Sequence, residues 1–231
     1  MAEAMICFGY EYIWVDGEHG VYDKAEILAH ITAINGAGGG AFVRATANDP
    51  TIIKPILEMG PNGIIVPMVN SAEEAAAFIS ACTYPPKGTR GFGPRRAIRY
   101  GTISNKEYLE TIDDSLVKII QIEHRMAVEN IDSILEVPGI DSIVVGSFDL
   151  SASMGILGQL LHPDMQIACK HIVERCKAYN IPCGPSLGVE NQEFLQFWLD
   201  LKPDFIFHGD DLGFIKMGVN ANIAKIREMR E

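Results

Sequence analysis

The chain has 231 residues, of which 48% are hydrophobic and 21% are charged, as expected for a protein that folds around one substantial core. Lysine and arginine number 19 and aspartate and glutamate 30, so the formal net charge is −11. This charge argues against nucleic acid as a partner, because binding phosphate backbones requires a broad cationic surface. We expect one domain over residues 1–231, with its few cations gathered locally or supplemented by a divalent metal.

Short apolar runs rich in isoleucine and valine alternate with longer stretches of helical periodicity along the chain. This alternation is typical of a parallel sheet with crossover helices. The runs predict seven strands, at residues 12–16, 41–46, 63–68, 118–123, 142–146, 181–186 and 204–208.

Start and stop signals delimit several of the intervening helices. Asp49 and Pro50 are suited to the N-cap and first position of a helix, and Gly60 to its C-terminal end. Ser71 and Glu74 have the spacing of a capping box, in which each side chain accepts a hydrogen bond from the other residue's amide.

A further helix is predicted to begin at His162-Pro163 and to end at Asn180. Residues 84–104 break the alternation, since they are rich in proline and glycine and carry five basic residues. We interpret this stretch as a long functional loop.

The polar residues decide between two α/β architectures. Asp16, Arg44 and Glu123 lie at or near the ends of predicted strands, and Asp149 follows another strand closely. A β/α barrel gathers such residues at the carboxyl ends of its strands. A dinucleotide-binding sheet would instead place a G-x-G-x-x-G motif after the first strand, where residues 16–19 read DGEH. The sequence therefore predicts a TIM-like (β/α)8 barrel.

The five cysteines form neither a C-x-x-C pair nor a cluster with zinc-like spacing. We interpret them as reduced thiols of a cytoplasmic protein. The apolar runs are far shorter than the roughly 20 residues of a membrane span, and no secretory signal pattern is present. No membrane partner is expected.

Glu123 and Asp149 are the candidate metal ligands. Two carboxylates facing each other across a barrel mouth suit Mg²⁺ or Mn²⁺, which prefer oxygen ligands and water. The structural alternatives are that Asp149 caps a helix starting at Leu150 and that Glu123 forms a buried ion pair with an arginine.

Arg44 is the cation among these strand ends, and its planar guanidinium suits a carboxylate or enolate oxygen. Alternatively, it pairs with Glu123 or Asp16. Asp16 could orient the imidazole of His19 for proton transfer, although His19 could equally be an ordinary loop histidine. No lysine ends a predicted strand, which argues against Schiff-base chemistry.

Six strings in order carry a resemblance to a known family. They are YIWVDGEHG at 12–20, VRA at 43–45, IVPMV at 65–69, YPPKGTRG at 84–91, QIE at 121–123 and GSFDLS at 146–151. The chain resembles the HpcH/HpaI aldolases, metal-dependent class II enzymes that cleave 4-hydroxy-2-oxo acids to pyruvate and an aldehyde by a retro-aldol reaction.

The resemblance implies a barrel assembled as a homo-hexamer of swapped-helix pairs and a divalent metal, Mg²⁺, Mn²⁺ or Co²⁺, that binds the ketone and carboxylate of a 2-oxo acid. It implies roles for nine residues. Glu123 and Asp149 would bind the metal, Gln121 would lie beside it, Arg44 would stabilise the enolate, Asp16 and His19 would move the proton, and Gly146, Ser147 and Phe148 would receive the carboxylate.

Two departures from the family pattern affect these expectations. Relatives normally have a strand and most of a helix before the Asp16 motif, and residues 1–9 are too few for both, so the first of eight strands is expected to be missing. The usual Gly-Pro-Ala before the metal aspartate is replaced by Gly146-Ser147-Phe148, and the bulky phenylalanine is expected to narrow the pocket.

Other functions remain open on the sequence alone. The same enolate chemistry serves oxaloacetate decarboxylation or a citrate-synthase-like condensation, and a truncated barrel could be non-catalytic. The loop cations could bind an anionic substrate tail or form interface ion pairs, and we favour the interface. These cations are Lys87, Arg90, Arg95, Arg96 and Arg99.

Overall fold

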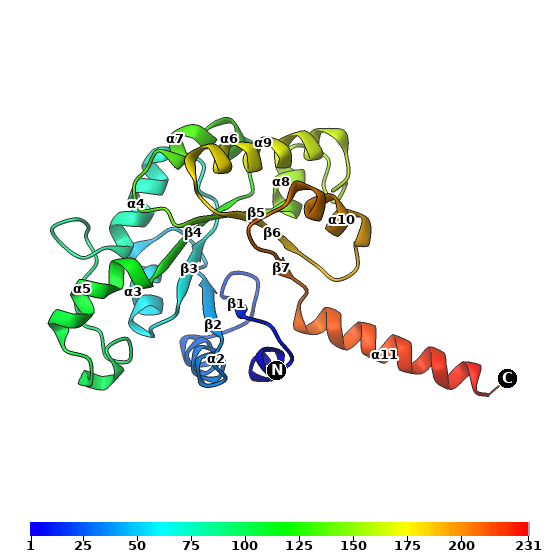
Figure 1. Ribbon diagram of the computed structural model, residues 1–231, viewed down its shortest axis with the longest axis horizontal. Coiled ribbons are helices and arrows are strands. Elements are labelled where there is room, and N and C mark those ends of the chain that lie inside the picture. Colours follow the sequence, from blue (N-terminus) through cyan, green and yellow to red (C-terminus); the bar gives the residue numbers. More distant parts are fainter. Residues whose placement is uncertain (231) are drawn as a thin grey trace.

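The computed structural model describes residues 1–230 and contains one sheet of seven parallel strands that curves into a nearly closed barrel (Figure 1). The strands follow one another in chain order, β1 to β7. They are β1 Tyr12–Asp16, β2 Gly40–Arg44, β3 Gly63–Val66, β4 Val117–Ile122, β5 Ser142–Gly146, β6 Cys183–Leu187 and β7 Phe207–His208. All seven predicted strands are confirmed, with boundaries shifted by up to three residues.

The helices lie outside the strands and cover the sheet, except for the last one. They are α1 Ala2–Cys7, α2 Lys24–Gly36, α3 Pro50–Glu58, α4 Ala72–Cys82, α5 Asn105–Ser115, α6 Arg125–Glu129, α7 Ile131–Leu135, α8 Ser147–Ser153, α9 Pro163–Tyr179, α10 Gln192–Leu201 and α11 Asp211–Glu228. The predicted loop 84–104 contains only a short 3₁₀ turn, η1 Arg99–Gly101.

The barrel is incomplete between its first and last strands. Within residues 1–230, β1 and β7 share no hydrogen-bonded ladder, which is where the expected eighth strand is missing. Side chains bridge the gap instead. The rings of Trp14 and Phe207 meet edge to face with centroids 5.1 Å apart, and the Tyr10 hydroxyl donates a hydrogen bond to the His208 carbonyl at 3.0 Å. These contacts hold the two edges near each other.

Alternation along the strands separates an inner from an outer face. The inner face carries a small apolar cluster, comprising Phe42, Ile65, Ile119 and Val144 with Trp14, Val117, Phe205 and Phe207 against it. The larger core lies between the strands and the helices and includes Val43, Ile64 and Ile120, all fully buried. Two residues further along β2 and β4 from Phe42 and Ile119, the inner positions become Arg44 and Gln121, so polar groups lie above the apolar cluster at the carboxyl end.

The helix signals are confirmed at their main positions. Asp49 caps α3 ahead of Pro50, and Gly60 has the positive φ of 68° expected after the helix. Ser71 accepts the Glu74 amide at 3.3 Å, but the capping box is not reciprocal. Glu74 accepts the amide of the preceding residue, Asn70, at 2.6 Å.

Helix α9 begins after His162 and ends at Asn180, which has a left-handed conformation with φ of 55°. This confirms the predicted limits of that helix, since asparagine tolerates the left-handed region better than most residues.

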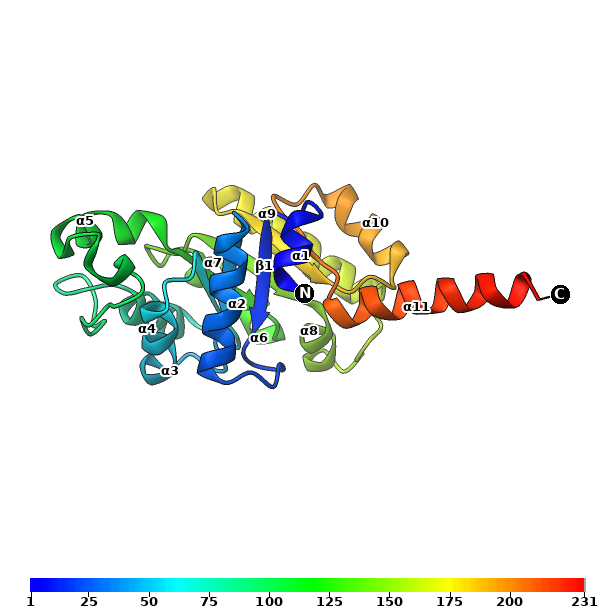
Figure 2. The same cartoon turned by 90° about the horizontal axis from the view of Figure 1, so that it is seen from below.

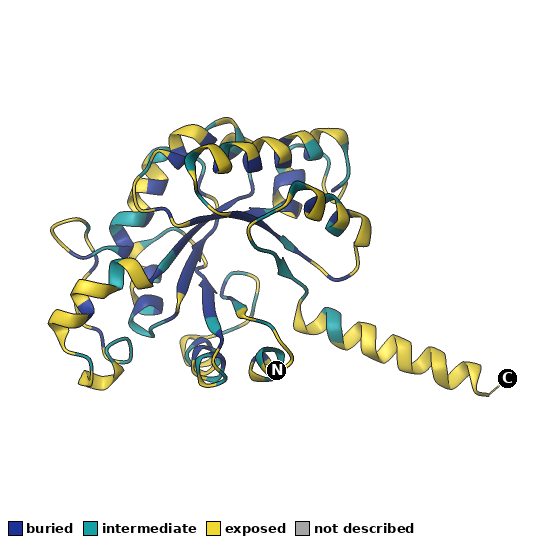
Figure 3. Cartoon of the chain, viewed as in Figure 1, coloured by how far each residue is buried: buried dark blue, intermediate teal, exposed yellow. Residues whose placement is uncertain are grey.

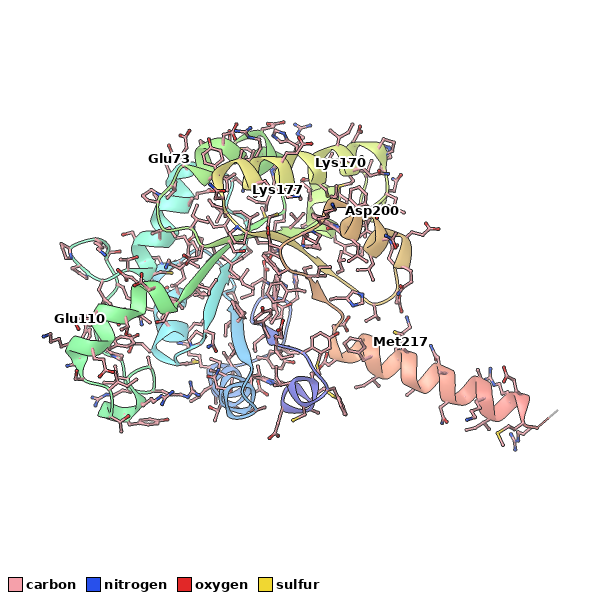
Figure 4. All side chains as sticks on the ribbon, in the orientation of Figure 1. Glu73, Glu110, Lys170, Lys177, Asp200 and Met217 are labelled. Atoms are coloured by element: carbon pink, nitrogen blue, oxygen red, sulfur yellow. The ribbon has the colours of Figure 1, made fainter. Side chains whose placement is uncertain are left out.

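Helix α11 projects from the barrel, as Figures 1 and 2 show. It has no buried residue, and Figure 3 shows it exposed beyond its first turns. Its side chains, including Met217, stand clear of the barrel beyond the first turns (Figure 4). Of the helices that the structure describes, none combines the length and hydropathy needed to cross a membrane.

Candidate active site

Arg44 occupies the centre of the polar layer at the carboxyl end of the barrel. Its Nε and Nη2 donate to the two carboxylate oxygens of Asp16 at 2.9 and 2.6 Å, and its Nη1 lies 2.9 Å from the Glu18 carboxylate. Asp16 and Arg44 are register partners on β1 and β2, and the guanidinium lies 5.0 Å from the ring of Trp14. The alternative that Arg44 pairs with Asp16 is confirmed, and the pair with Glu123 is absent from residues 1–230.

The turn after β1 wraps tightly around Asp16. Its Oδ1 accepts the amides of Glu18 and His19 at 3.0 and 3.2 Å. A Cβ on Gly17 would come within 2.5 Å of the Arg44 carbonyl, and one on Gly20 would overlap the Asp16 carbonyl. Glycine is therefore required at both positions, and the turn presents the Glu18 carboxylate to Arg44.

Asp16 does not orient the His19 imidazole, contrary to expectation. Its carboxylate is occupied by Arg44 and by backbone amides, and within the described chain His19 contributes only its amide to this network, its side chain being exposed. Burial raises the pKa of Asp16, but the hydrogen bonds and charge of Arg44 outweigh it and hold this pKa below its usual value.

Glu123, just beyond β4, is buried with 3% of its surface exposed. Its Oε1 accepts the Met68 amide at 2.7 Å, and its Oε2 accepts a hydrogen bond from the Gln121 amide group. Gln121 Oε1 accepts a weak hydrogen bond from Arg44 at 3.4 Å. A continuous network therefore runs from Asp16 through Arg44 and Gln121 to Glu123.

The environment of Glu123 disfavours its charged form. Burial is the main cause that raises its pKa to about 7, the nearby charges of Glu18 and Asp149 add to it, and the Met68 and Gln121 hydrogen bonds oppose it. None of the ion pairs among residues 1–230 involves Glu123, so the predicted alternative of a buried pair with an arginine is wrong.

Asp149 lies in the first turn of α8, beside the end of β5. Gly146 is the N-cap of this helix, so the alternative that Asp149 caps a helix starting at Leu150 is wrong. The Asp149 charge raises the pKa of both Glu18 and Glu123, so it contributes to the negative potential at this end of the barrel.

The segment from Gly146 to Phe148 forms the wall next to Glu123. A Cβ on Gly146 would lie 2.6 Å from the Gln121 amide nitrogen and 2.9 Å from a Glu123 carboxylate oxygen, so no larger residue fits. Ser147 is buried, and its hydroxyl has no hydrogen-bond partner within the described residues. Phe148 is 60% exposed and points away from the core.

The charge of this cluster suits a divalent cation. Two carboxylates, those of Asp16 and Glu18, pair with Arg44, and the Glu123 and Asp149 carboxylates at the same end have no cationic partner within residues 1–230. No group of three potential ligands is preassembled in residues 1–230. Glu123 and Asp149 form a pair of oxygen donors, which suits Mg²⁺, an ion that commonly uses one or two carboxylates with water and substrate oxygens. The uncompensated Glu123 favours such an ion, because positive charge would stabilise its ionised form.

Two residues that contribute to the hydrogen-bond and ion-pair network of the site were not identified from the sequence. Glu18 pairs with Arg44, and its place in the DGEH string directly after a strand was the available signal. Met68 contributes its amide to Glu123 from a left-handed backbone conformation with φ of 56°. A backbone donor on an apolar residue leaves no trace in side-chain patterns.

A pocket of about 230 Å³ opens beside the cluster at the carboxyl ends of β2 and β3. Its lining residues include Glu18, Thr46, Asn48, Met68 and Glu74. The site therefore combines an acidic cluster with space for a small polar molecule.

The match to a family model decides the relationship of this chain to known proteins. Residues 1–196 match the model of the HpcH/HpaI aldolase/citrate lyase family. The chain belongs to this family. Because members are aldolases and lyases, and the matched relatives include named aldolases, family membership supports a carbon–carbon lyase.

Relatives of the HpcH/HpaI chain agree in sequence and in fold. The 5-keto-4-deoxy-D-glucarate aldolase of Salmonella arizonae is 36% identical over 211 residues, which cover 91% of this chain and 81% of the relative. An HpcH/HpaI family protein from Burkholderia cenocepacia superposes with a TM-score of 0.91 at 26% identity, covering 98% of this chain and 89% of the other. The citrate synthase SbnG superposes with a TM-score of 0.87 at 28% identity, covering 99% and 89%.

Proposed function

We propose that this protein cleaves a 4-hydroxy-2-oxo acid to pyruvate and an aldehyde by a retro-aldol reaction. The observation that carries the proposal is the buried Glu123 carboxylate beside Asp149 and the Arg44–Gln121 network, at the end of the barrel where the strands gather functional groups. The name of the Salmonella relative supports the substrate class, since a 5-keto-4-deoxy hexarate numbered from its other end is a 4-hydroxy-2-oxo acid.

Glu123 and Asp149 would hold a divalent cation, Mg²⁺, Mn²⁺ or Co²⁺. When bound, this ion supplies positive charge beside the ketone oxygen of the substrate. Gln121 would hold the Glu123 carboxylate in orientation through its amide group. The raised pKa of Glu123 supports this assignment, because the free site lacks the cation that its carboxylate needs.

Cleavage breaks the bond between C3 and C4 of the substrate. His19 would accept the proton of the C4 hydroxyl, the C4–O bond would become the aldehyde carbonyl, and the electron pair of the broken bond would pass to the pyruvate fragment as an enolate. Arg44, held in place by Asp16 and Glu18, would stabilise the negative oxygen, and a proton returned to C3 would give pyruvate. Asp16 therefore acts on Arg44 and on the turn, rather than on the imidazole.

The segment from Gly146 to Phe148 would receive the carboxylate of the 2-oxo acid. The buried, unpartnered hydroxyl of Ser147 supports this role, since such a group gains a hydrogen bond from an anionic ligand. Phe148 would lie at the mouth and restrict the size of the aldehyde.

A second candidate is the condensation of the enolate of an acetyl thioester with the ketone of oxaloacetate, followed by hydrolysis of the thioester, which gives the tricarboxylate citrate and a free thiol. The similarity to the citrate synthase SbnG favours it. The two reactions would use the same three residues, Glu123, Asp149 and Arg44. They would differ in the part of the substrate that occupies the pocket beside Glu18. Product analysis with oxaloacetate therefore separates them.

We also propose that the chain forms a homo-oligomer, a hexamer in the family arrangement, with α11 packed against another copy. The helix exposes apolar side chains that have no partner in residues 1–230. They include Leu212, Ile215, Met217, Val219, Ile223 and Ile226. An exposed apolar surface of this kind marks an interaction site. Sedimentation of Ile223→Glu should show smaller particles than the wild type, and unchanged particles would contradict the assignment.

The test is pyruvate release from a panel of 4-hydroxy-2-oxo acids, followed with a pyruvate-specific coupled assay, before and after chelation. Release that is lost on chelation, restored by Mg²⁺ or Mn²⁺ and absent in Glu123→Gln supports the proposal. Glu129→Gln is the matched control, because Glu129 is exposed and pairs only with Arg125 on α6. Citrate formed from oxaloacetate and an acetyl thioester, without aldol cleavage, would instead favour the condensation.

A further inference from the structure

A second cavity lies at the end of the barrel opposite the candidate active site. It has a volume of about 620 Å³ and lies below the amino ends of β2, β3 and β4, between the end of α2, the loop 84–104 and α5. Barrel enzymes use the carboxyl ends of their strands for catalysis, so the proposed aldolase reaction gives this cavity no role.

Arg90 lines the cavity with a fully buried side chain. Its guanidinium lies 4.4 Å from the ring of Tyr84, and its Nη2 donates to the Tyr108 hydroxyl at 3.0 Å. Its Nε and Nη1 have no partner among the described residues. These two nitrogens carry three N–H groups, and leaving them without acceptors on a buried cation is costly unless a ligand or water supplies the acceptors.

Glu58 is the carboxylate nearest to Arg90, and it does not satisfy this guanidinium. The closest approach is 3.9 Å, between its Oε1 and Arg90 Nη2, and neither carboxylate oxygen accepts a hydrogen bond within the described chain. Burial raises the pKa of Glu58, while the charges of Arg90 and Lys54 lower it, so the carboxyl is only partly compensated.

Two further arginines line the same cavity. Arg96 donates through Nη1 to the carbonyls of Met59 and Gly60 at 2.5 and 3.4 Å, which fixes its guanidinium at the cavity wall. Arg99 lies at the exposed rim. Within residues 1–230, neither arginine has a carboxylate within 4.0 Å, and Glu107 is the single acidic residue in the lining.

The cavity therefore concentrates positive charge in a protein whose net charge is −11. Three arginines face one glutamate, and the remaining wall combines apolar side chains such as Leu57 and Ile112 with the Tyr108 ring. A volume of 620 Å³ lies within the roughly 300–1,000 Å³ typical of small-molecule sites. Guanidinium groups bind carboxylates and phosphates through paired hydrogen bonds.

We propose that this cavity binds a small organic oxyanion, a phosphate- or carboxylate-bearing metabolite, through Arg90, Arg96 and Arg99. Arg90 would contribute its positive charge from the buried wall, and Arg96 at the wall and Arg99 at the rim would donate hydrogen bonds to the ligand. The site is distinct from the candidate active site and does not depend on the proposed reaction.

The competing use of these cations is an interface between subunits. Lys87, which lies in the same loop, already forms an ion pair with Asp113 of its own chain at 3.2 Å. Arg90 lies in the cavity wall and its side chain is fully buried, so it is not available on an outer surface to another subunit.

Isothermal titration calorimetry with inorganic phosphate and with citrate tests the proposal on chelator-treated full-length protein. Without metal, the carboxyl-end cluster is an excess of carboxylates and repels anions, so the titration reports the cavity. We expect saturable binding of one or both probes, with one site per chain. Arg96→Gln and Arg99→Gln should each weaken it about tenfold, since each removes a charge-assisted hydrogen bond.

Arg95→Gln is the matched control, because Arg95 is exposed in the same loop and does not line the cavity. It should retain the wild-type affinity. Tighter binding of phosphate than of citrate would assign a phosphorylated ligand, and the reverse a polycarboxylate. The proposal fails if neither probe binds at millimolar concentration, or if all variants bind alike. It also fails if Arg96→Gln and Arg99→Gln change only the oligomer size.

Discussion

The two ends of this barrel carry opposite charge. At the carboxyl end, Arg44 pairs with two of four carboxylates, whereas at the amino end three arginines share a cavity with Glu107. The same strands, β2 to β4, lead to both. Of the two cavities, the one at the amino end is larger, about 620 Å³ against 230 Å³, so cavity size alone would favour the end opposite the proposed active site. Charge and strand direction instead favour the carboxyl end.

The largest expected effect separates the ends by activity. Glu123→Gln should lower kcat/KM for pyruvate release at least about a hundredfold, because it removes a charged ligand of the proposed metal and leaves the packing intact. Arg99→Gln at the other end should leave kcat/KM unchanged. Steady-state kinetics on both variants decides, and comparable losses in the two would contradict the division of roles.

The next effect concerns the single cation of the acidic end. Arg44→Met should lower the free energy of unfolding by about 2–3 kcal/mol, less than for a fully buried pair, because Asp16 and Glu18 retain some contact with water. Urea unfolding measures the change.

Adding Glu18→Gln to Arg44→Met provides the control for this effect. The second substitution removes one of the unpaired charges and should recover part of the lost stability. If it destabilises the chain further, the loss comes from packing against Trp14 instead of charge.

A smaller effect should appear with pH in the metal-free protein. The pKa of Glu123 is raised from 4.5 to about 7, so the folded chain holds this proton more tightly than the unfolded chain does. The protonated Glu123 therefore adds to the free energy of unfolding, by at most about 3 kcal/mol. This stabilisation is complete below pH 4.5 and is lost as the pH rises through 7. Thermal melts between pH 5 and 8 should show this decline in the wild type.

Glu123→Gln should remove that decline, since glutamine resembles the protonated carboxyl. Histidines titrate in the same pH range in both proteins, so their effect on the melting temperature cancels when the two pH profiles are subtracted. Mg²⁺ should raise the melting temperature of the wild type most at the alkaline end. An identical pH profile in both proteins would show that Glu123 is not the titrating group.

The smallest expected effect belongs to the amino end. Arg99→Gln should change the free energy of unfolding by less than about 0.5 kcal/mol without ligand, because Arg99 is exposed and unpaired by any described carboxylate. With saturating phosphate, the wild type should melt at a higher temperature than Arg99→Gln. Equal melting temperatures of the two proteins in phosphate would contradict anion binding by Arg99 at the amino end.

The sequence predicted the strands, and the rim at which the candidate residues lie, for a physical reason. Each strand is a buried apolar run, and Asp16, Arg44 and Glu123 lie at or just beyond the end of such a run, so strand direction puts them at one rim. Asp149 also lies near this rim, although it stands inside helix α8, which begins at Ser147 and not at Leu150.

The partners of these residues could not be predicted in the same way. Whether Arg44 binds Asp16, Glu18 or Glu123 depends on how the glycine turn at 17–20 folds back, and several pairings fit the same spacing. The Met68 amide is a backbone donor and has no side-chain signature. The five loop cations were visible, but only folding shows that three of them enter a cavity while Arg95 does not.

The gap between β1 and β7 has a consequence for local unfolding. Within residues 1–230 each of these strands has a hydrogen-bonded neighbour on one side only, and contacts such as Trp14–Phe207 and Tyr10–His208 span the other. Amides on the free edge of β1 should therefore exchange with deuterium faster than those of β4, which is paired on both sides. Because Asp16 ends β1, opening of this edge would release Arg44, so the least protected strand carries part of the proposed catalytic network.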